Sequence, residues 1–378
     1  MDNKFTHDER VAYFSMEIAL RPEIPTYSGG LGILAGDTIR SSADLEIPLV
    51  AVSLVSHAGH FRQEIDDQGR QIEHPDPWSP EQWAKPLEAK VSVPMEGRNV
   101  WVGGWLYILE GHLGGRQPVI FLDTDLNENS QEDRLITHYL YGGDVAYRLK
   151  QEIVLGIGGV RMLQAMGFRI SKYHMNEGHS ALLALELLRR YAYMEEDMRP
   201  GEPPYDIPVV REHCIFTTHT PVEAGQDQFP YDLVERTLGD FIHMDVLKLL
   251  AGDNVMNMTR LALNLSEHIN GVAQRHAETS RRLFPGYQIR AITNGVHPYT
   301  WASPGFSMLY DEYVKGWCHE PELLVRAERI PDEAVWSAHM QAKNKLIARA
   351  KELCSIELKS ELPILGFARR MTEYKRPN

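Results

Sequence analysis

A glycine-rich stretch near the N terminus has the composition of an anion-binding loop. It reads Tyr27-Ser28-Gly29-Gly30-Leu31-Gly32 and precedes a segment with the apolar spacing of a helix. Glycine has no side chain, so backbone N–H groups can approach an anion at the helix N terminus, where the helix dipole favours negative charge. The stretch matches neither a P-loop nor a GxGxxG fingerprint. The glycines alone favour the simpler interpretation of a tight turn with a glycine at positive φ.

Two further motifs place polar side chains directly after predicted strands. The first, 174–180, contains Glu177 and His179, which could bind a sugar. In the second, 216–223, His219 could exchange hydrogen bonds with a sugar hydroxyl without adding a large charge. The carboxyl ends of strands line the ligand crevice of an open α/β sheet. Structural alternatives remain, because these residues could also cap a helix, pack in a core or form a turn.

Two more motifs carry groups that suit a polyol or a phosphate. Asn294 offers a donor and an acceptor, although the Asn-Gly pair by itself signals only a turn. Arg369, Arg370 and Lys375 follow an apolar segment, and their guanidinium and ammonium groups can hold phosphate oxygens. Four motifs at predicted strand ends thus supply an anion cradle, cationic groups and polyol binders.

Composition and charge exclude several classes of function. The 378 residues include 39 Lys and Arg against 52 Asp and Glu, and the formal net charge of −13 disfavours binding to nucleic acid or to an anionic membrane surface. No stretch reaches the roughly 18 apolar residues of a membrane span. Three separated cysteines without a CxxC predict neither disulfides nor a zinc site and fit the cytoplasm. The absence of HExxH and GxSxG motifs leaves metal-dependent hydrolysis and serine acyl transfer without support.

The elements around the motifs predict an α/β fold with a largely parallel sheet. Helical patterns separate several short apolar runs that are typical of strands, at 11–16, 47–56, 118–122 and 214–218. The longest helical pattern, 131–167, is interrupted by glycines at 142–143 and 156–159, which indicates two or more helices. Another helical pattern follows the strand that precedes Glu177.

The last part of the chain has a different pattern. A polar helix is expected over 331–354, and the apolar segment 362–368 is interpreted as a buried strand that begins a second domain. One strand cannot bury both faces, so we expect truncation or completion by another chain. The expected domains are an N-terminal α/β domain over 1–300 and, over 301–378, connecting helices with the start of an incomplete cofactor-binding domain.

In this order, the motifs resemble those of the α-glucan (glycogen, starch and maltodextrin) phosphorylases, particularly the shorter microbial type. The resemblance covers nearly the whole chain, and its most specific stretches are 13–17, 27–44, 174–180, 219–223, 270–273, 293–297 and 369–376. It implies a two-domain, Rossmann-like glycosyltransferase fold of the B type, of which this chain holds the N-terminal domain and the start of the C-terminal one. Catalysis would occur between the domains, with pyridoxal phosphate bound on the C-terminal side.

The resemblance implies that several residues contact the sugar. His219 and Asn294 would bind the C6 hydroxyl of the transferred glucosyl unit, with His219 in the catalytic set. Glu177 and His179 would shape the neighbouring pocket, and Tyr374 would touch the sugar.

Other residues would serve the two phosphates. Gly30 and Leu31 would offer N–H groups, Gly30 on the cofactor side and Leu31 on the substrate side. Arg370 and Lys375 would hold the substrate phosphate as catalytic residues, and Arg369 would lie near the cofactor phosphate. The lysine that forms the family's Schiff base belongs to a later motif, and Lys375 is not that residue.

The implied reaction is phosphorolysis of a terminal α-1,4-linked glucose by inorganic phosphate, with retention, to give α-glucose 1-phosphate. The cofactor phosphate, with a second pKa of about 6, could exchange a proton with the substrate phosphate, so no protein carboxylate pair is required. The partners would be an α-1,4-glucan and inorganic phosphate, and a homo-oligomer is compatible with the family. Two alternatives stay open: a nucleotide-sugar glucosyltransferase of the glycogen synthase kind and a non-catalytic glucan-binding fragment.

Overall fold

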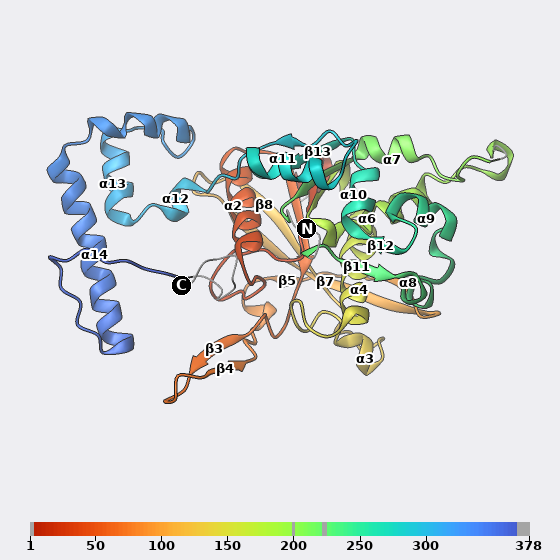
Figure 1. The fold of residues 1–378 in the computed structure, drawn as a ribbon, viewed down its shortest axis with the longest axis horizontal. Helices are drawn as coiled ribbons and strands as arrows, with labels where there is room; N and C mark the ends of the chain where they lie inside the picture. The colour runs from red at the N-terminus through yellow and green to blue at the C-terminus, as the bar shows by residue number, and fades with distance from the viewer. Residues whose placement is uncertain (1–3, 199–200, 221–224, 369–378) are drawn as a thin grey trace. The chain divides into compact units, whose positions relative to one another are not determined.

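A ten-stranded sheet forms the centre of the first part of the chain in the computed structural model, which describes residues 4–198, 201–220 and 225–368 (Figure 1). Consecutive parallel neighbours in this sheet are β14, β13, β10, β9, β1, β2 and β8. Their bounds, in the same order, are Arg290–Ala291, His268–Gly271, Cys214–Thr218, Arg169–Asn176, Glu9–Phe14, Leu49–Leu54 and Arg116–Asp123. The largely parallel α/β sheet predicted from the sequence is therefore confirmed.

The four apolar runs singled out in the sequence all form strands of this sheet. All six residues of β2 are buried, as expected for a parallel strand that is covered on both faces. The sequence did not indicate the antiparallel edge, where β7 (Arg98–Glu110) pairs with β8, β5 (Lys85–Pro86) and β6 (Val91–Met95). Gly103 and Gly104 interrupt the apolar pattern of β7, which explains why it was missed.

Alternate residues of the central strands pack into separate cores on the two faces of the sheet. On one face, Tyr13 and Phe121 belong to a cluster that includes buried residues of α2 (Gly30–Asp44). On the other face, Phe14 and Leu122 join a larger cluster of helical residues. This period of two, with apolar residues on both sides, fixes the register of the strands and hence the position of their carboxyl ends.

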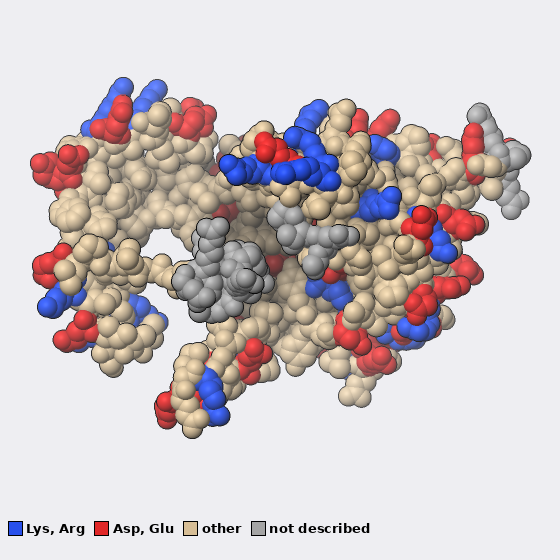
Figure 2. All heavy atoms as spheres, in the orientation of Figure 1, with Lys and Arg blue, Asp and Glu red and all other residues tan. Residues whose placement is uncertain are grey.

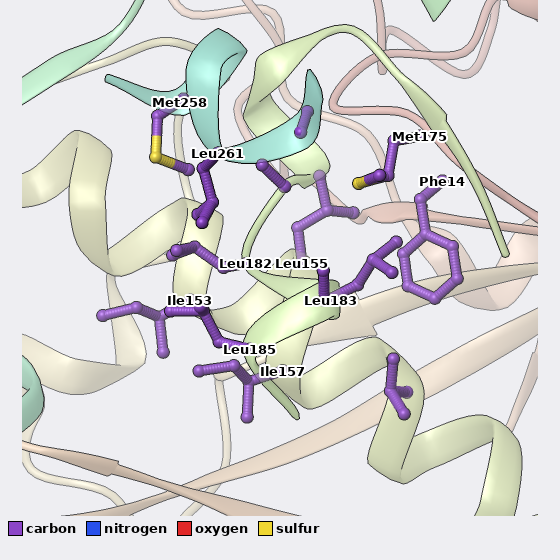
Figure 3. Packing of buried hydrophobic residues seen from close by; sticks show 14 of the residues in the cluster. Phe14, Ile153, Leu155, Ile157, Met175, Leu182, Leu183, Leu185, Met258 and Leu261 are labelled. Carbon is purple, nitrogen blue, oxygen red and sulfur yellow. The ribbon is translucent and has the colours of Figure 1, made fainter. Parts of the chain in front are cut away.

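The helical segment behind the second face is continuous at a point where the sequence indicated a break. α4 (Val145–Ile153) passes through the π-helical segment η2 (Val154–Gly158) into α5 (Gly159–Ala165). A Cβ atom on Gly156 would lie 2.5 Å from the amide nitrogen of Leu183, so glycine is needed for close packing there. Figure 3 shows side chains of η2, such as Leu155 and Ile157, close to those of residues 182–185. The interruption predicted at residues 142–143 is confirmed, since α4 begins beyond it.

The remaining helices and strands of this part lie around the sheet or project from it. They are α1 (Lys4–His7), η1 (Pro80–Gln82), α3 (Gln131–Arg134), η3 (Gly178–Ser180), α6 (Leu183–Arg190), η4 (Glu195–Asp197), α7 (Ile207–His213), α8 (Tyr231–Leu238), η6 (Gly239–Phe241), α9 (Met244–Ala251), α10 (Met258–Asn264) and α11 (Gln274–Leu283), with the two-stranded pairs β3 (Arg62–Ile65) and β4 (Gln71–His74), and β11 (Gln228–Pro230) and β12 (Val255–Asn257). Figure 2 shows Lys and Arg side chains gathered over α11, so basic charge is locally concentrated on this acidic chain.

The chain divides into two compact units, Met1–His297 and Pro298–Asn378. The second unit contains α12 (Pro298–Trp301), α13 (Pro304–Tyr313), the 3₁₀ segment η7 (Pro321–Arg329) and α14 (Asp332–Cys354). Its small core is built around Val314, Trp317 and Ile330. The position of α14 confirms the helix predicted at 331–354. Within the described ranges, no helix combines the length and hydropathy of a membrane-spanning segment.

The prediction of a buried strand at 362–368 is wrong. These residues are irregular, and the side chains of Leu365 and Phe367 are 97% and 55% exposed. An apolar segment becomes a strand only when neighbouring strands take its backbone hydrogen bonds. The described part of Pro298–Asn378 contains helices and no strand that could do so.

Candidate active site

Five neighbouring parallel strands end at one edge of the sheet, and the predicted motifs follow them. Glu17 lies beyond β1, Glu177 beyond β9, His219 beyond β10, Gly271 at the end of β13 and Asn294 beyond β14. Because these strands are parallel and in register, residues far apart in the sequence meet at this edge. Hydrogen bonds between the first three segments show which side chains meet.

The glycine-rich loop is held by the carboxylate of Glu17. One oxygen, Oε2, accepts hydrogen bonds from the amides of Ser28 (2.6 Å) and Gly29 (3.0 Å). α2 begins at the next residue, and no described residue accepts a hydrogen bond from the amide of Gly30 or Leu31. The N terminus of this 15-residue helix therefore presents two amides that could bind an anion.

His219 is fixed by side chains from the neighbouring strand end. Its Nε2 lies 2.7 Å from Oδ1 of Asn176, and its backbone amide donates to Glu177 Oε2 over 2.8 Å. Burial lowers the pKa of His219 to about 3, and the nearby His276, His174 and His179 rings act in the same direction. The imidazole is therefore neutral near pH 7 and can exchange hydrogen bonds with a hydroxyl group.

Glu177 anchors this turn. Its backbone has φ of 73° and ψ of 166°, a region that a residue other than glycine adopts at a cost of about 1–3 kcal/mol. The buried carboxylate accepts hydrogen bonds from the amides of Gly178 and His219 and from the hydroxyl of Thr220. Burial raises the pKa of Glu177 despite these donors. The geometry gives Glu177 a structural role around His219, and its contact with substrate stays a prediction.

A charged cluster that the sequence did not indicate adjoins His179. Asp227 Oδ2 lies 3.2 Å from His179 Nε2 and 3.1 Å from Arg148 Nη2. Arg148 also pairs with Glu152 at 3.1 Å and lies over the ring of Tyr141, 4.4 Å from its centroid. Burial raises the pKa of Glu152 well above its usual value and lowers that of His179 to about 4. The signal for this cluster in the sequence was the spacing of Arg148 and Glu152, which lie four residues apart on a helix that is buried from Leu149 onward.

Tyr141 connects this cluster to the glycine-rich loop. Its hydroxyl donates to Oε1 of Glu17 over 2.9 Å, while the other oxygen of Glu17 holds the loop amides. Burial raises the pKa of Tyr141, so the phenol stays protonated and keeps this hydrogen bond. The N terminus of α2 and the environment of His179 are thus joined through two side chains.

Asn294 follows the last parallel strand at the same edge of the sheet. Its backbone amide donates to the carbonyl of Val272 over 3.0 Å, and the residue is exposed. Nearby, His297 is buried against Asp44, with 2.8 Å between Nε2 and Oδ2. The backbone of the Asn294 loop is therefore held while its amide side chain is accessible.

Comparison with known proteins identifies the family. No family model matches the chain. The chain is 38% identical to maltodextrin phosphorylase of Thermococcus litoralis over 98% of its length, and 33% identical to glycogen phosphorylase of Mycobacterium tuberculosis over 97%. Glycogen phosphorylase of Aquifex aeolicus is 29% identical over 99% of this chain. The chain belongs to the α-glucan phosphorylase family. It spans about half the length of the relatives that it matches, 48%, 48% and 59% respectively.

The phosphorylase family implies a phosphate-bearing cofactor, and part of the site suits such a group. The amides of Gly30 and Leu31 at the N terminus of α2 are donors of the kind that bind phosphate. The other predicted phosphate ligands, Arg369, Arg370 and Lys375, lie outside the described residues, as does Tyr374. Among the residues that are described, no group of three or more His, Cys, Asp or Glu side chains is arranged to hold a metal ion.

Proposed function

We propose that this chain forms part of an α-1,4-glucan phosphorylase, which transfers terminal glucose units of glycogen or maltodextrin to inorganic phosphate. The similarity to maltodextrin phosphorylase along 98% of the chain carries this proposal. The product would be α-glucose 1-phosphate, formed with retention. The chain would hold the first domain of a two-domain glycosyltransferase fold of the B type, and the protein would act in the cytoplasm.

The sheet edge would bind the transferred glucosyl unit through neutral groups. His219 and Asn294 would bind the C6 hydroxyl, and His179 would lie near the sugar. The transition state of glycosyl transfer has oxocarbenium character, so a cation beside the ring would destabilise it. The pKa values of about 3 for His219 and about 4 for His179 keep both imidazoles uncharged at neutral pH. The site would thus recognise hydroxyl groups without repelling the developing charge.

The helix N terminus would bind phosphate. The amides of Gly30 and Leu31 would stabilise phosphate oxygens through fixed dipoles, which need no reorganisation during the reaction. We propose pyridoxal phosphate as the cofactor, with Gly30 and Arg369 on its side and Arg370 and Lys375 on the substrate phosphate. When bound, the cofactor supplies a phosphate whose second pKa of about 6 permits proton exchange near neutral pH.

The test is release of glucose 1-phosphate from maltodextrin, followed with and without inorganic phosphate. The 378-residue chain and the full-length protein are each supplied with pyridoxal phosphate. We expect phosphate-dependent release by the full-length protein. Transfer from a nucleotide sugar, or glucan binding without release of product by the folded, cofactor-loaded full-length protein, would refute the proposal.

A further inference from the structure

A relay of hydrogen bonds connects Ser15, Asn176 and His219. The hydroxyl of Ser15 donates to the carbonyl of Glu17 over 2.7 Å. Nδ2 of Asn176 donates to Oγ of Ser15 over 3.1 Å, and Oδ1 of Asn176 lies 2.7 Å from Nε2 of His219. Ser15 and Asn176 are both buried. The three side chains come from the ends of β1, β9 and β10, so the relay crosses three strands.

The chemistry of each group fixes the direction of the relay. A serine hydroxyl has one hydrogen, and that of Ser15 is directed to the Glu17 carbonyl, which can only accept. Oγ of Ser15 must therefore accept from the amide nitrogen of Asn176. The amide is oriented by this bond, and its oxygen faces His219. Since that oxygen can only accept, Nε2 of His219 must carry a proton.

We infer that Ser15 and Asn176 are positioning residues that lock neutral His219 in its Nε2–H tautomer, so that Nδ1 accepts a hydrogen bond from a sugar hydroxyl. The assignment of a sugar to this site rests on the proposed function. The consequence is specificity: the site favours a glucosyl unit whose C6 substituent can donate. A fluorine at that position, which can only accept, would face the lone pair of Nδ1.

The opposite tautomer requires two changes in the relay. The amide of Asn176 would have to turn over and direct its nitrogen to Nε2 of His219. The Ser15 hydroxyl would then have to leave the Glu17 carbonyl to meet the Asn176 oxygen. Burial disfavours both, because a buried carbonyl that loses its donor is left unsatisfied. The low pKa of His219 supports the lock, since a protonated ring would donate from both nitrogens.

The first test measures the tautomer by ¹H–¹⁵N NMR of the imidazoles in the 378-residue chain, with His219 assigned from the spectrum of His219→Gln. We expect Nε2–H in the wild type. Ser15→Ala frees the Asn176 amide to turn, so a mixture of tautomers is expected. The matched control is Ser53→Ala, which removes another buried serine that donates to a backbone carbonyl, that of Met16, and should leave the tautomer unchanged. Nδ1–H in the wild type, or an unchanged tautomer in folded Ser15→Ala, would overturn the inference.

The second test uses the full-length enzyme with its cofactor, elongating maltodextrin from analogues of glucose 1-phosphate. The 6-deoxy-6-fluoro analogue should react no faster than the 6-deoxy analogue, because fluorine cannot donate to Nδ1. A fluoro analogue that reacts ten or more times faster would show a donor at Nδ1 and contradict the lock. Failure with glucose 1-phosphate itself would defeat the proposed function, while the NMR result would still decide the tautomer.

Discussion

Two partly buried histidines lie beyond strand ends of the same sheet, His219 after β10 and His57 after β2, and their pKa values shift in opposite directions. His219 faces the amide of Asn176, and its pKa falls to about 3. His57, beyond β2, lies 3.0 Å from the carboxylate of Asp123 at the end of β8. Burial alone would lower the pKa of His57, but Asp123 outweighs burial and raises it. The carboxylate of Asp123 thus offsets the effect of burial on His57, whereas the amide of Asn176 leaves the effect of burial on the pKa of His219 uncompensated.

The two pairs also differ in their surroundings. Asp123 is buried, and it receives further hydrogen bonds from Trp105 Nε1 at 2.8 Å and from Thr137 Oγ1 at 3.3 Å. The His57–Asp123 pair therefore resembles a structural ion pair whose carboxylate already has its hydrogen-bond donors. Nε2 of His219 is occupied by Asn176, and His219 belongs to the edge where the amides of Gly30 and Leu31 donate to no described residue. Binding chemistry is expected at the neutral pair, and stability at the charged pair.

The largest expected effect comes from giving His219 a carboxylate partner. Asn176→Asp should raise the pKa of His219, as Asp123 does for His57, and a protonated Nδ1 can no longer accept a hydrogen bond. Phosphorolysis near pH 6 should fall roughly 100-fold. The assay is glucose 1-phosphate release by the full-length enzyme, with an NMR titration of His219. An unchanged titration would show that the partner does not set the charge.

A second expectation concerns acid stability. His219 has a folded-state pKa below its unfolded value of about 6.5, so the unfolded state binds the proton and stability falls as the pH falls below 6.5. His219→Gln removes this contribution. Between pH 6.5 and 5, the wild type should lose about 1.6 kcal/mol of stability more than the variant. Urea unfolding of both chains measures the difference, and equal slopes would contradict a neutral His219.

Removing the carboxylate from the charged pair should have the opposite pH dependence. The pKa of His57 is raised in the folded state, so its contribution is complete below about 6.5 and is lost as the pH rises through the folded value. Asp123→Asn should cost about 1.5 kcal/mol at pH 6 and less at pH 9. Urea unfolding at both pH values tests this, and a constant difference would exclude a charged His57.

The smallest expected effect is the loss of one donor to Asp123. Trp105→Phe keeps an aromatic ring and removes the Nε1 hydrogen bond, so it should cost about 1 kcal/mol. The matched control is Trp101→Phe on the same strand, whose side chain is more exposed and should change stability by less than about 0.5 kcal/mol. Equal effects of the two changes would show that the Asp123 hydrogen bond contributes little.

The sequence predicted the parallel strands and the strand-end position of His219 because burial on both faces produces continuous apolar runs. It did not reveal Arg148, Asp227 and Tyr141, whose roles depend on contacts between residues distant in sequence. The segment 362–368 shows that an apolar run alone does not establish a strand. Its apolar pattern is typical of a strand, but a strand forms only when neighbouring strands take its hydrogen bonds. The predicted roles of Arg370 and Lys375 fall outside the described residues.

The most direct test compares the two histidines in one assay of phosphate-dependent glucose 1-phosphate release by the full-length, cofactor-loaded enzyme. His219→Gln should lower the rate by about 100-fold or more, because a neutral acceptor at the sugar is lost. His57→Gln should leave the rate within about threefold of the wild type once both proteins are shown to be folded. A wild type that releases no glucose 1-phosphate, or equal losses in the two folded variants, would contradict the assignment of the active site to the His219 edge of the sheet.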